Sequence, residues 1–487
     1  MAKRNRSAQR PQPQHKKSRP SQHDQRSRLL QRNPRRRKTT QAQVPLVGAM
    51  QAAVATLQAV LDPRNAFRLA IIVAGMLLAD GRITASAWFH CAGVTDDWDR
   101  FYDGLISIGR RVRPLATAVA TLVLRKFAPG LGGHLLVALD DSPTKRYGRQ
   151  VEGAGVHHDP TPGPAGGEWL YGHNWVSLAL LVNHPKWGVI ALALRSRLYV
   201  RAVDVPQLDE QRGWKFRTKH ELAVELVAWF VDTLRKLGLT CALWIVVDGA
   251  YAARPFLDAA IKLGAVVISR LRKDAKLFDL PPARQPDQRG RPRKYGEHRI
   301  DLAKRAAHPQ GWESSTYHCR GREVTRQYKT FLALSTLSDS PIRVVLVQFA
   351  DGGWAPYFST DATMTVKDIL ETVASRWALE EHFHDVKEVW GAGQQQVRNV
   401  WSNIGCWHLN QWLFTLVELC SWDEPQHTLS NRQDRPWDNP DRRPSHADRR
   451  RAIGREMLEK QFLSVLLPTP DPGKYRALVT SLLSLCL

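Results

Sequence analysis

Two aliphatic runs that each stop at an aspartate constrain the fold of this chain more than any other feature. The segment LLVALDDS (135–142) ends in Asp140 and Asp141, and LWIVVDGAY (243–251) contains Asp248 directly after its apolar part. Short aliphatic runs stopped by turn-forming residues are typical of buried strands in an α/β sheet. In such sheets, ligands bind in the crevice beyond the carboxyl ends of the strands. The sequence therefore predicts a site that these aspartates share.

A third acidic residue lies in a predicted helix, SRWALEEHFHDVKE (375–388). Glu380 follows Arg376 by four residues and precedes Lys387 by seven, so the three side chains share one helical face. Glu381 is rotated by about 100° from Glu380, away from these cations. We therefore prefer Glu380 as the functional acid.

The order and context of these motifs resemble the DDE transposases, most closely the insertion-sequence-4-like group and its insertion-sequence-701 type. Four motifs in roughly residues 130–410 carry the resemblance: D-x-S at Asp140, D-G-x-Y at Asp248, S-T-D at 359–361, and R-W-x-x-E-x-x-F-x-x-x-K at 376–387. The motif spacing favours Asp140 over Asp141, because Ser142 then stands two residues after the catalytic acid. One position departs from the pattern, since Val373 replaces the Tyr that commonly precedes the Arg by three residues.

The resemblance implies a ribonuclease H-like catalytic domain in which Asp140, Asp248 and Glu380 are the catalytic residues. Three carboxylates of this kind would hold two Mg²⁺ ions, with Mn²⁺ as an alternative, because hard cations prefer oxygen ligands. Taken alone, each acid is more often a turn residue, a cap or a surface charge. The combination of motifs is what favours a catalytic role.

Cationic residues near the motifs are candidates for binding DNA phosphates. Arg376 would bind bidentately and Lys387 as a point charge, whereas the alternative role for both is in surface salt bridges. Three further candidates, Arg291, Arg293 and Lys294, lie in the segment RGRPRKYG (289–296). Arg-Gly-Arg-Pro can enter an A·T-rich minor groove, but we favour a solvated or phosphate-contacting loop. For Trp377 and Phe383 in the helix, we expect contacts with the core.

The charge of the chain agrees with a nucleic-acid partner. Residues 1–44 contain fourteen Lys or Arg and one Asp, which is more than half of the net charge of +24. This tail has almost no aliphatic content, so we expect it to be disordered and to add salt-sensitive affinity for DNA. The alternative is a solubilising tail.

The remaining composition indicates a cytoplasmic, nucleoid-associated protein. The longest apolar run, LAIIVAGMLL (69–78), is half of the ~20 residues that a membrane span needs. The Arg-rich N-terminus is not followed by an apolar region of the kind found in secretory signals. The six cysteines are scattered and form no C-x-x-C pair, which indicates a reducing compartment without a structural zinc site.

These patterns predict an α/β fold: a ribonuclease H-like mixed sheet with flanking helices, interrupted by a β-rich insertion, with an N-terminal helical domain and C-terminal helices. The predicted boundaries are a basic tail at 1–44, a helical domain that could bind DNA ends at 45–130, the catalytic core at 131–275 and 363–420, the insertion at 276–362, a linker at 421–444 and C-terminal helices at 445–487.

The function that these features predict is a Mg²⁺-dependent DNA transposase. It would cleave the inverted-repeat ends of a mobile element and join their 3′ ends to double-stranded target DNA. From the resemblance we also expect a homodimer in the synaptic complex. The alternatives are a catalytically inactive DNA-binding relative and a metal-dependent nuclease that does not transfer strands.

Overall fold

A computed structural model describes residues 46–466, apart from residues 131, 160–166, 284–288, 292, 431–436, 438, 440 and 441, together with residues 473 and 479. All described residues belong to one unit that spans residues 42–487. The predicted disordered tail, part of the predicted linker and most of the last predicted helix lie outside the described residues. None of the described helices is long and apolar enough to cross a membrane.

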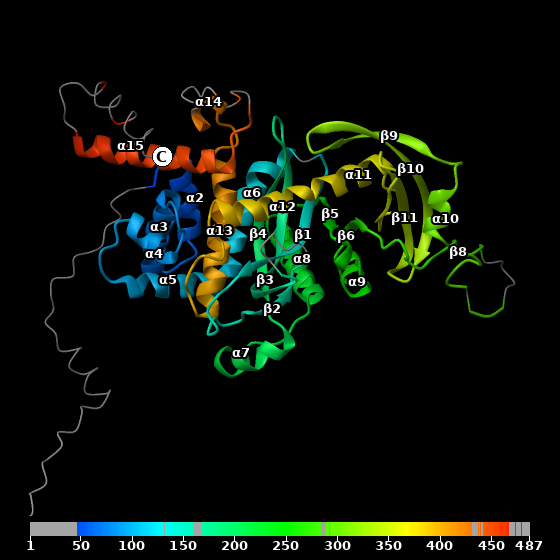
Figure 1. Ribbon diagram of the computed structural model, residues 1–487, viewed down its shortest axis with the longest axis horizontal. Coiled ribbons are helices and arrows are strands. Elements are labelled where there is room, and N and C mark those ends of the chain that lie inside the picture. The colour runs from blue at the N-terminus through cyan, green and yellow to red at the C-terminus, as the bar shows by residue number, and fades with distance from the viewer. Residues whose placement is uncertain are drawn as a thin grey trace, which may run out of the picture. The chain divides into compact units, whose positions relative to one another are not determined.

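Helices fill the N-terminal part of the described chain, as the spacing of its apolar residues predicts (Figure 1). Local sequence sets their ends: Asp62 caps the second helix by accepting from the Asn65 backbone amide (3.2 Å), and Pro63 occupies its first turn. The helices are α2 (Gly48–Gln58), α3 (Pro63–Leu78), α4 (Ala85–Cys91), α5 (Trp98–Arg110) and α6 (Val112–Phe127).

Residues 134–270 form a mixed sheet in the ribonuclease H-like order β4-β3-β1-β5-β6. Strand β3 is antiparallel to both β1 and β4, whereas β5 and β6 run parallel to β1. The elements of this part are β1 (His134–Lys145), β2 (Gly155–His158), β3 (Trp169–His184), β4 (Gly188–Tyr199), α7 (Val205–Arg212), α8 (Lys219–Lys236), β5 (Ala242–Val247), α9 (Arg254–Lys262) and β6 (Ala265–Arg270).

The strands after β6 extend the same sheet, so that it has twelve strands in all within the described residues. Strand β12 pairs with β6, and β11, β10 and β7 follow in that order. These added elements are β7 (Leu277–Phe278), β8 (Arg299–Ile300), α10 (Leu302–Ala307), β9 (Glu313–Cys319), β10 (Arg322–Ser335), β11 (Ser338–Gln348) and β12 (Trp354–Ser359). The segment between the second aspartate motif and the glutamate helix is therefore rich in strands, as the sequence predicts.

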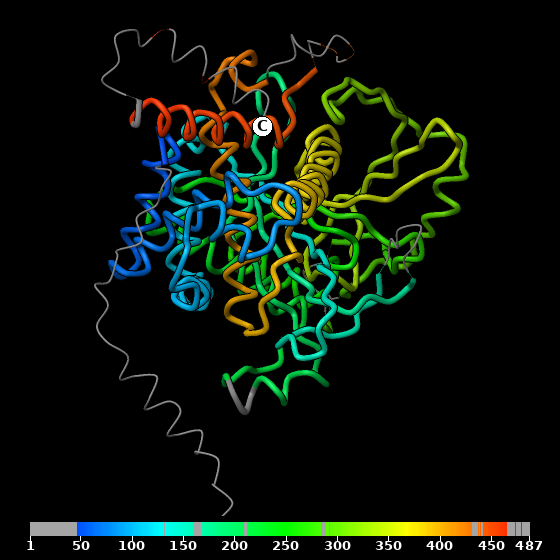
Figure 2. Tube along the Cα trace, turned by 60° about the vertical axis from the view of Figure 1, so that its left-hand side comes forward, coloured from blue at the N-terminus to red at the C-terminus, as the bar shows by residue number. Residues whose placement is uncertain are grey.

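The chain then returns to the core through helices. The helices are α11 (Val366–Ser375), α12 (Trp377–Glu388), α13 (Val400–Cys420), α14 (Gln426–Leu429) and α15 (His446–Leu466). Figure 2 looks almost along α11 and α12, which follow one another nearly in line. A capping box opens α15, because Ser445 and Asp448 each accept from the other's backbone amide (3.2 and 2.9 Å). The sequence predicts this helix start correctly.

Helix α13 is buried along almost its whole length, and it crosses α5 at close range. The crossing depends on two glycines: a Cβ on Gly109 would lie 1.8 Å from the Trp401 carbonyl oxygen, and one on Gly405 would lie 2.4 Å from the Leu105 carbonyl oxygen. On its other side α13 packs on the sheet, where Gln411 accepts from Ser196 of β4 (2.5 Å). The helix therefore joins the N-terminal helices to the sheet.

Candidate active site

Strands β1, β5 and β6 run parallel, and their residues at one level of the sheet lie in a row. The prediction that the first strand stops at Asp140 and Asp141 is wrong, because β1 continues through both residues to Lys145 while it pairs with β3. Strands β1 and β5 stay in register up to Leu139 and Val247, so Asp140 and Asp248 occupy the next level, on the same face. Strand β6 continues the row and ends at Arg270. This placement follows from the parallel pairing, because side chains at equal register point to the same side.

Helix α12 brings Glu380 to the same place. Arg376, at the junction of α11 and α12, donates to Asp140 Oδ2 through Nη1 (2.6 Å) and to Glu380 Oε1 through Nη2 (2.5 Å). The three side chains are only 18–35% exposed. One guanidinium therefore joins the Asp140 carboxylate of β1 to the Glu380 carboxylate of α12.

Asp140 is buried among charges of both signs. Burial raises its pKa to about 7, and the nearby carboxylates of Asp141 and Asp248 add to the rise, while the Arg376 guanidinium opposes it. The Asp141 backbone amide donates to Asp140 Oδ1 (2.8 Å).

Asp141 has different partners from Asp140. Its carboxylate accepts from Lys219 Nζ at the start of α8 (2.6 Å) and from the Tyr251 hydroxyl (2.9 Å). Helix α8 packs on the sheet face opposite the one that α13 covers, where its Glu225 carboxylate pairs with Arg197 of β4. Asp141 therefore points towards α8. Asp140 is therefore the member of the pair that lies beside Glu380, in line with the choice made from motif spacing.

The acids form no ready-made metal site as they stand. Within the described part of the chain, no group of three or more His, Cys, Asp or Glu side chains is arranged to hold a metal ion, and Arg376 lies between two of the three proposed ligands. Their chemistry nevertheless fits a divalent cation, since all three donors are carboxylates. For all three acids to bind a metal, Arg376 would have to turn away from them.

The other proposed phosphate ligands differ in their burial and in their partners. Burial lowers the pKa of Lys387, which is half-buried rather than free at the surface. In the loop at 289–296, Arg291 is exposed, Arg293 pairs with Glu297 (2.9 Å), and Lys294 pairs with Asp339 (2.7 Å). Exposed pairs of this kind contribute about 0–1 kcal/mol, so they can open easily to contact a phosphate.

The structure also brings cations to the site that the motifs do not include. A cavity of about 400 Å³ at the ends of β5 and β6 is lined by Asp248, Arg270, Arg272 and Lys273, among others. Arg272 pairs with Asp274 (2.9 Å), whereas Arg270 is exposed and has no carboxylate within 4 Å among the described residues. The signal was present in the sequence as a cationic run directly after a predicted parallel strand.

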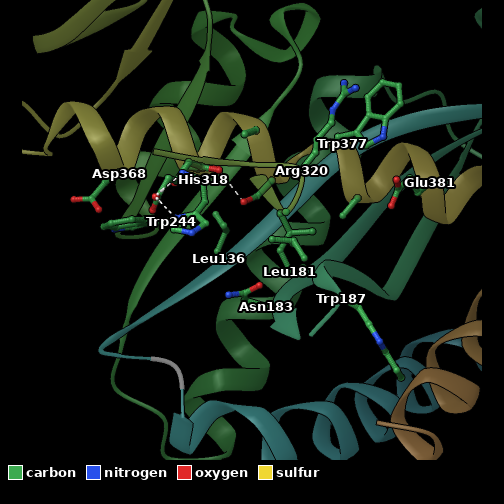
Figure 3. A pocket seen from close by; sticks show the side chains of 18 of the residues that line it. Leu136, Leu181, Asn183, Trp187, Trp244, His318, Arg320, Asp368, Trp377 and Glu381 are labelled. Atoms are coloured by element: carbon green, nitrogen blue, oxygen red, sulfur yellow. Dashed lines mark hydrogen bonds and ion pairs between the residues drawn. The ribbon is translucent and has the colours of Figure 1, made fainter. Parts of the chain in front are cut away.

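A larger cavity, of about 530 Å³, is lined by residues that include none of the three acids. Figure 3 shows side chains that line it, among them Trp377 and Arg320. The tip of the β9–β10 hairpin, the first turn of α12 and the opening residues of β1 contribute to it. The expectation that Trp377 contacts the core is wrong, because this side chain is 38% exposed and the Arg320 guanidinium covers its ring at 3.9 Å. Phe383, on another face of the helix, is buried as predicted.

Comparison with known proteins decides the family. A family model described as "DDE superfamily endonuclease" matches residues 56–331, more than half of the chain. The chain belongs to the DDE superfamily of endonucleases. The match includes Asp140 and Asp248 and ends before Glu380. Members of this superfamily use divalent metals, which agrees with the carboxylate set of this endonuclease.

Two other comparisons add little to the family assignment. No curated protein matches this DDE endonuclease. Among solved structures, it is similar to a piggyBac transposase synaptic complex with hairpin DNA, determined by cryo-electron microscopy, at a TM-score of 0.36 and 10% sequence identity. The similarity covers 92% of this chain and 79% of that one.

Proposed function

We propose that this DDE endonuclease is a DNA transposase of the insertion-sequence-4-like group that cuts the inverted-repeat ends of its element and joins them to target DNA. The observation that supports this most is the bridge from Asp140 through Arg376 to Glu380. Through this bridge a carboxylate of α12 lies close to Asp140, which occupies the same level of the sheet as Asp248. Motifs that are 240 residues apart in the chain thereby meet at one point.

In the proposed reaction, a water oxygen forms a bond to phosphorus and the 3′ oxygen of the neighbouring nucleotide leaves in line with it. Strand transfer repeats the displacement with the freed 3′-hydroxyl as the attacking group, so no protein nucleophile is needed. Asp140, Asp248 and Glu380 would hold divalent metal, which when bound supplies Lewis-acid stabilisation of the attacked phosphate and of the leaving oxygen. Arg376, once released from the carboxylates, would bind a phosphate oxygen, and Arg270 lies where it can contact the strand beside Asp248.

The test is cleavage of a duplex that carries the inverted repeats flanking the gene, in Mg²⁺ or Ca²⁺. We expect Mg²⁺-dependent nicking at the repeat end that falls at least 1000-fold in Asp140→Asn, Asp248→Asn and Glu380→Gln, while DNA binding in Ca²⁺ persists. Glu381→Gln is the matched control, because that neighbouring carboxylate is exposed and lies outside the bridge.

The same experiment separates the alternatives. A parent protein that binds the repeats and never cuts them would be a DNA-binding relative. A substrate with a free 3′-hydroxyl, offered with a target plasmid, distinguishes a transposase from a nuclease, because only a transposase gives joined products.

A further inference from the structure

Behind the proposed catalytic acids, a hydrogen-bonded cluster joins three separate elements. Asp141 of β1 accepts from the Tyr251 hydroxyl through Oδ1 (2.9 Å) and from Lys219 Nζ through Oδ2 (2.6 Å). Lys219 begins α8, and Tyr251 ends the turn that follows β5. Both oxygens of one carboxylate are therefore occupied by donors from outside its own strand.

Tyr251 is fixed to the turn that contains Asp248. Its backbone amide donates to the Asp248 carbonyl oxygen (3.0 Å), and its side chain is 2% exposed, with its ring beside those of Phe256 and His220. The His220 ring also bonds the carbonyl oxygen of Ala250 in the same turn (3.1 Å). The turn is thus held twice by the first residues of α8, directly through His220 and indirectly through Tyr251.

The other end of the cluster reaches Asp140. The backbone amide of Asp141 donates to Asp140 Oδ1 (2.8 Å). The contacts that fix Asp141 therefore also fix the amide that orients the Asp140 carboxylate. A continuous path of bonded groups therefore runs from Asp248 through Tyr251 and Asp141 to Asp140. Hydrogen bonds to a charged carboxylate are shorter and about twice as strong as neutral ones, which suits them to hold a fixed separation.

We propose that Tyr251 is a positioning residue that, through Asp141, sets the separation of the Asp140 and Asp248 carboxylates for metal binding. The inference rests on the proposed function and deepens it, because it assigns a role to a side chain that touches neither metal nor DNA. Sites of this kind need their ligands held within about 0.5 Å. Loss of an outer partner of a metal ligand typically costs 10- to 100-fold in affinity or activity.

The test uses the full-length protein and the variant Tyr251→Phe, which keeps the buried ring and removes only the hydroxyl. Tyr328→Phe is the matched control, since it removes a bond of the same kind, from the Tyr328 hydroxyl to Glu313 (2.5 Å), on β9 and β10. Three quantities are measured: hydrogen exchange of the amides of residues 248–253, Mn²⁺ affinity without DNA, and the rate of repeat-end cleavage.

We expect exchange in the turn to rise about tenfold in Tyr251→Phe, and Mn²⁺ affinity and the cleavage rate each to fall about tenfold. Affinity for the repeat DNA in Ca²⁺ should not change, which distinguishes a positioning role from a general loss of folding. The control should match the parent protein in every measurement.

The outcomes separate this inference from the function on which it rests. If the parent binds Mn²⁺ and cuts DNA while Tyr251→Phe does both equally well, the positioning role is wrong and the function stands. Unchanged exchange in the turn also overturns the positioning role. A parent that neither binds Mn²⁺ nor cuts DNA overturns the proposed function and this inference with it.

Discussion

At the scale of single residues, Arg376 is the side chain on which the state of the site depends. It neutralises Asp140 and Glu380 together, in the place where the acids would otherwise repel one another. Its charge competes with a metal for the same carboxylates, yet the same charge suits it to bind a phosphate. Under the proposed function, we therefore expect Arg376 to oppose metal binding and to promote DNA cleavage.

We expect Arg376→Ala to bind Mn²⁺ more tightly in the absence of DNA and to cleave DNA more slowly. Removal of one neighbouring charge is worth on the order of 1 kcal/mol, or about fivefold in affinity. Arg376→Lys keeps the charge without the two-pronged geometry, so its Mn²⁺ affinity should stay near that of the parent. Calorimetric titration with Mn²⁺ measures the effect, and weaker Mn²⁺ binding by the alanine variant would contradict this account.

The sequence predicted which residues lie close together better than it predicted the orientation and depth of their side chains. The aliphatic runs, the helical spacing and the resemblance together predicted that Asp140, Asp248 and Glu380 form one site, and in the structure Asp140 and Glu380 share one guanidinium. Helical spacing gives the face on which a residue lies but not its depth, so the partial burial of Lys387 could not be predicted. Nor could the outward position of Trp377, because it depends on the Arg320 side chain from a distant hairpin.

At the scale of elements, the β9–β10 hairpin contacts the first turn of α12 through Arg320, a residue with a positive φ. Its turn consists of Arg320 and Gly321, both with positive φ (52° and 75°), as the right-handed twist of hairpin strands favours. Glycine accepts this conformation readily, whereas any other residue there is strained by roughly 1–2 kcal/mol. The strain is offset in part by the Arg320–Trp377 contact, which is worth about 0.5–1 kcal/mol.

Two substitutions of Arg320 distinguish the backbone strain of its positive φ from the stabilisation by its contact with Trp377. Arg320→Ala should destabilise the protein by about 0.5–1 kcal/mol, because it loses the contact with Trp377 and keeps the strain. Arg320→Gly should be close to neutral, since relief of the strain is offset by the lost contact together with the greater conformational freedom of glycine in the unfolded chain. Urea denaturation measures both, with Arg322→Ala on the same hairpin as the control. Equal losses of unfolding free energy in the alanine and glycine variants would contradict the presence of backbone strain at Arg320.

At the scale of the whole molecule, α15 joins the N-terminal helices to the catalytic helices. Arg450 donates to backbone carbonyl oxygens at the end of α3 and to that of Val389, just after α12. Glu418 of α13 accepts from the His446 ring (2.6 Å) and from Arg449. The sequence predicted α15 from its capping box but not these contacts, since their partners lie up to 374 residues away.

We expect Glu418→Gln to lower the free energy of unfolding at pH 7 by about 3–5 kcal/mol, because it leaves the fully buried Arg449 without its counter-charge. Glu381→Gln, which changes an exposed carboxylate on α12, should alter it by less than about 0.5 kcal/mol. Urea denaturation of both variants gives the comparison. A loss below about 1 kcal/mol for Glu418→Gln would mean that this ion pair does not hold α15 in place.

The same carboxylate should make stability depend on acid pH. Burial alone would raise the pKa of Glu418, but Arg449 and His446 outweigh it and lower the pKa to about 2 from an ordinary value of 4.5. A carboxyl whose pKa is depressed by folding contributes its full stability above pH 4.5 and loses it as the pH falls towards 2. The difference in unfolding free energy between the parent and Glu418→Gln should therefore be constant from pH 7 to about 5 and shrink between pH 4.5 and 2. A difference that stays constant to pH 2 would show that Glu418 contributes through its shape and not through its charge.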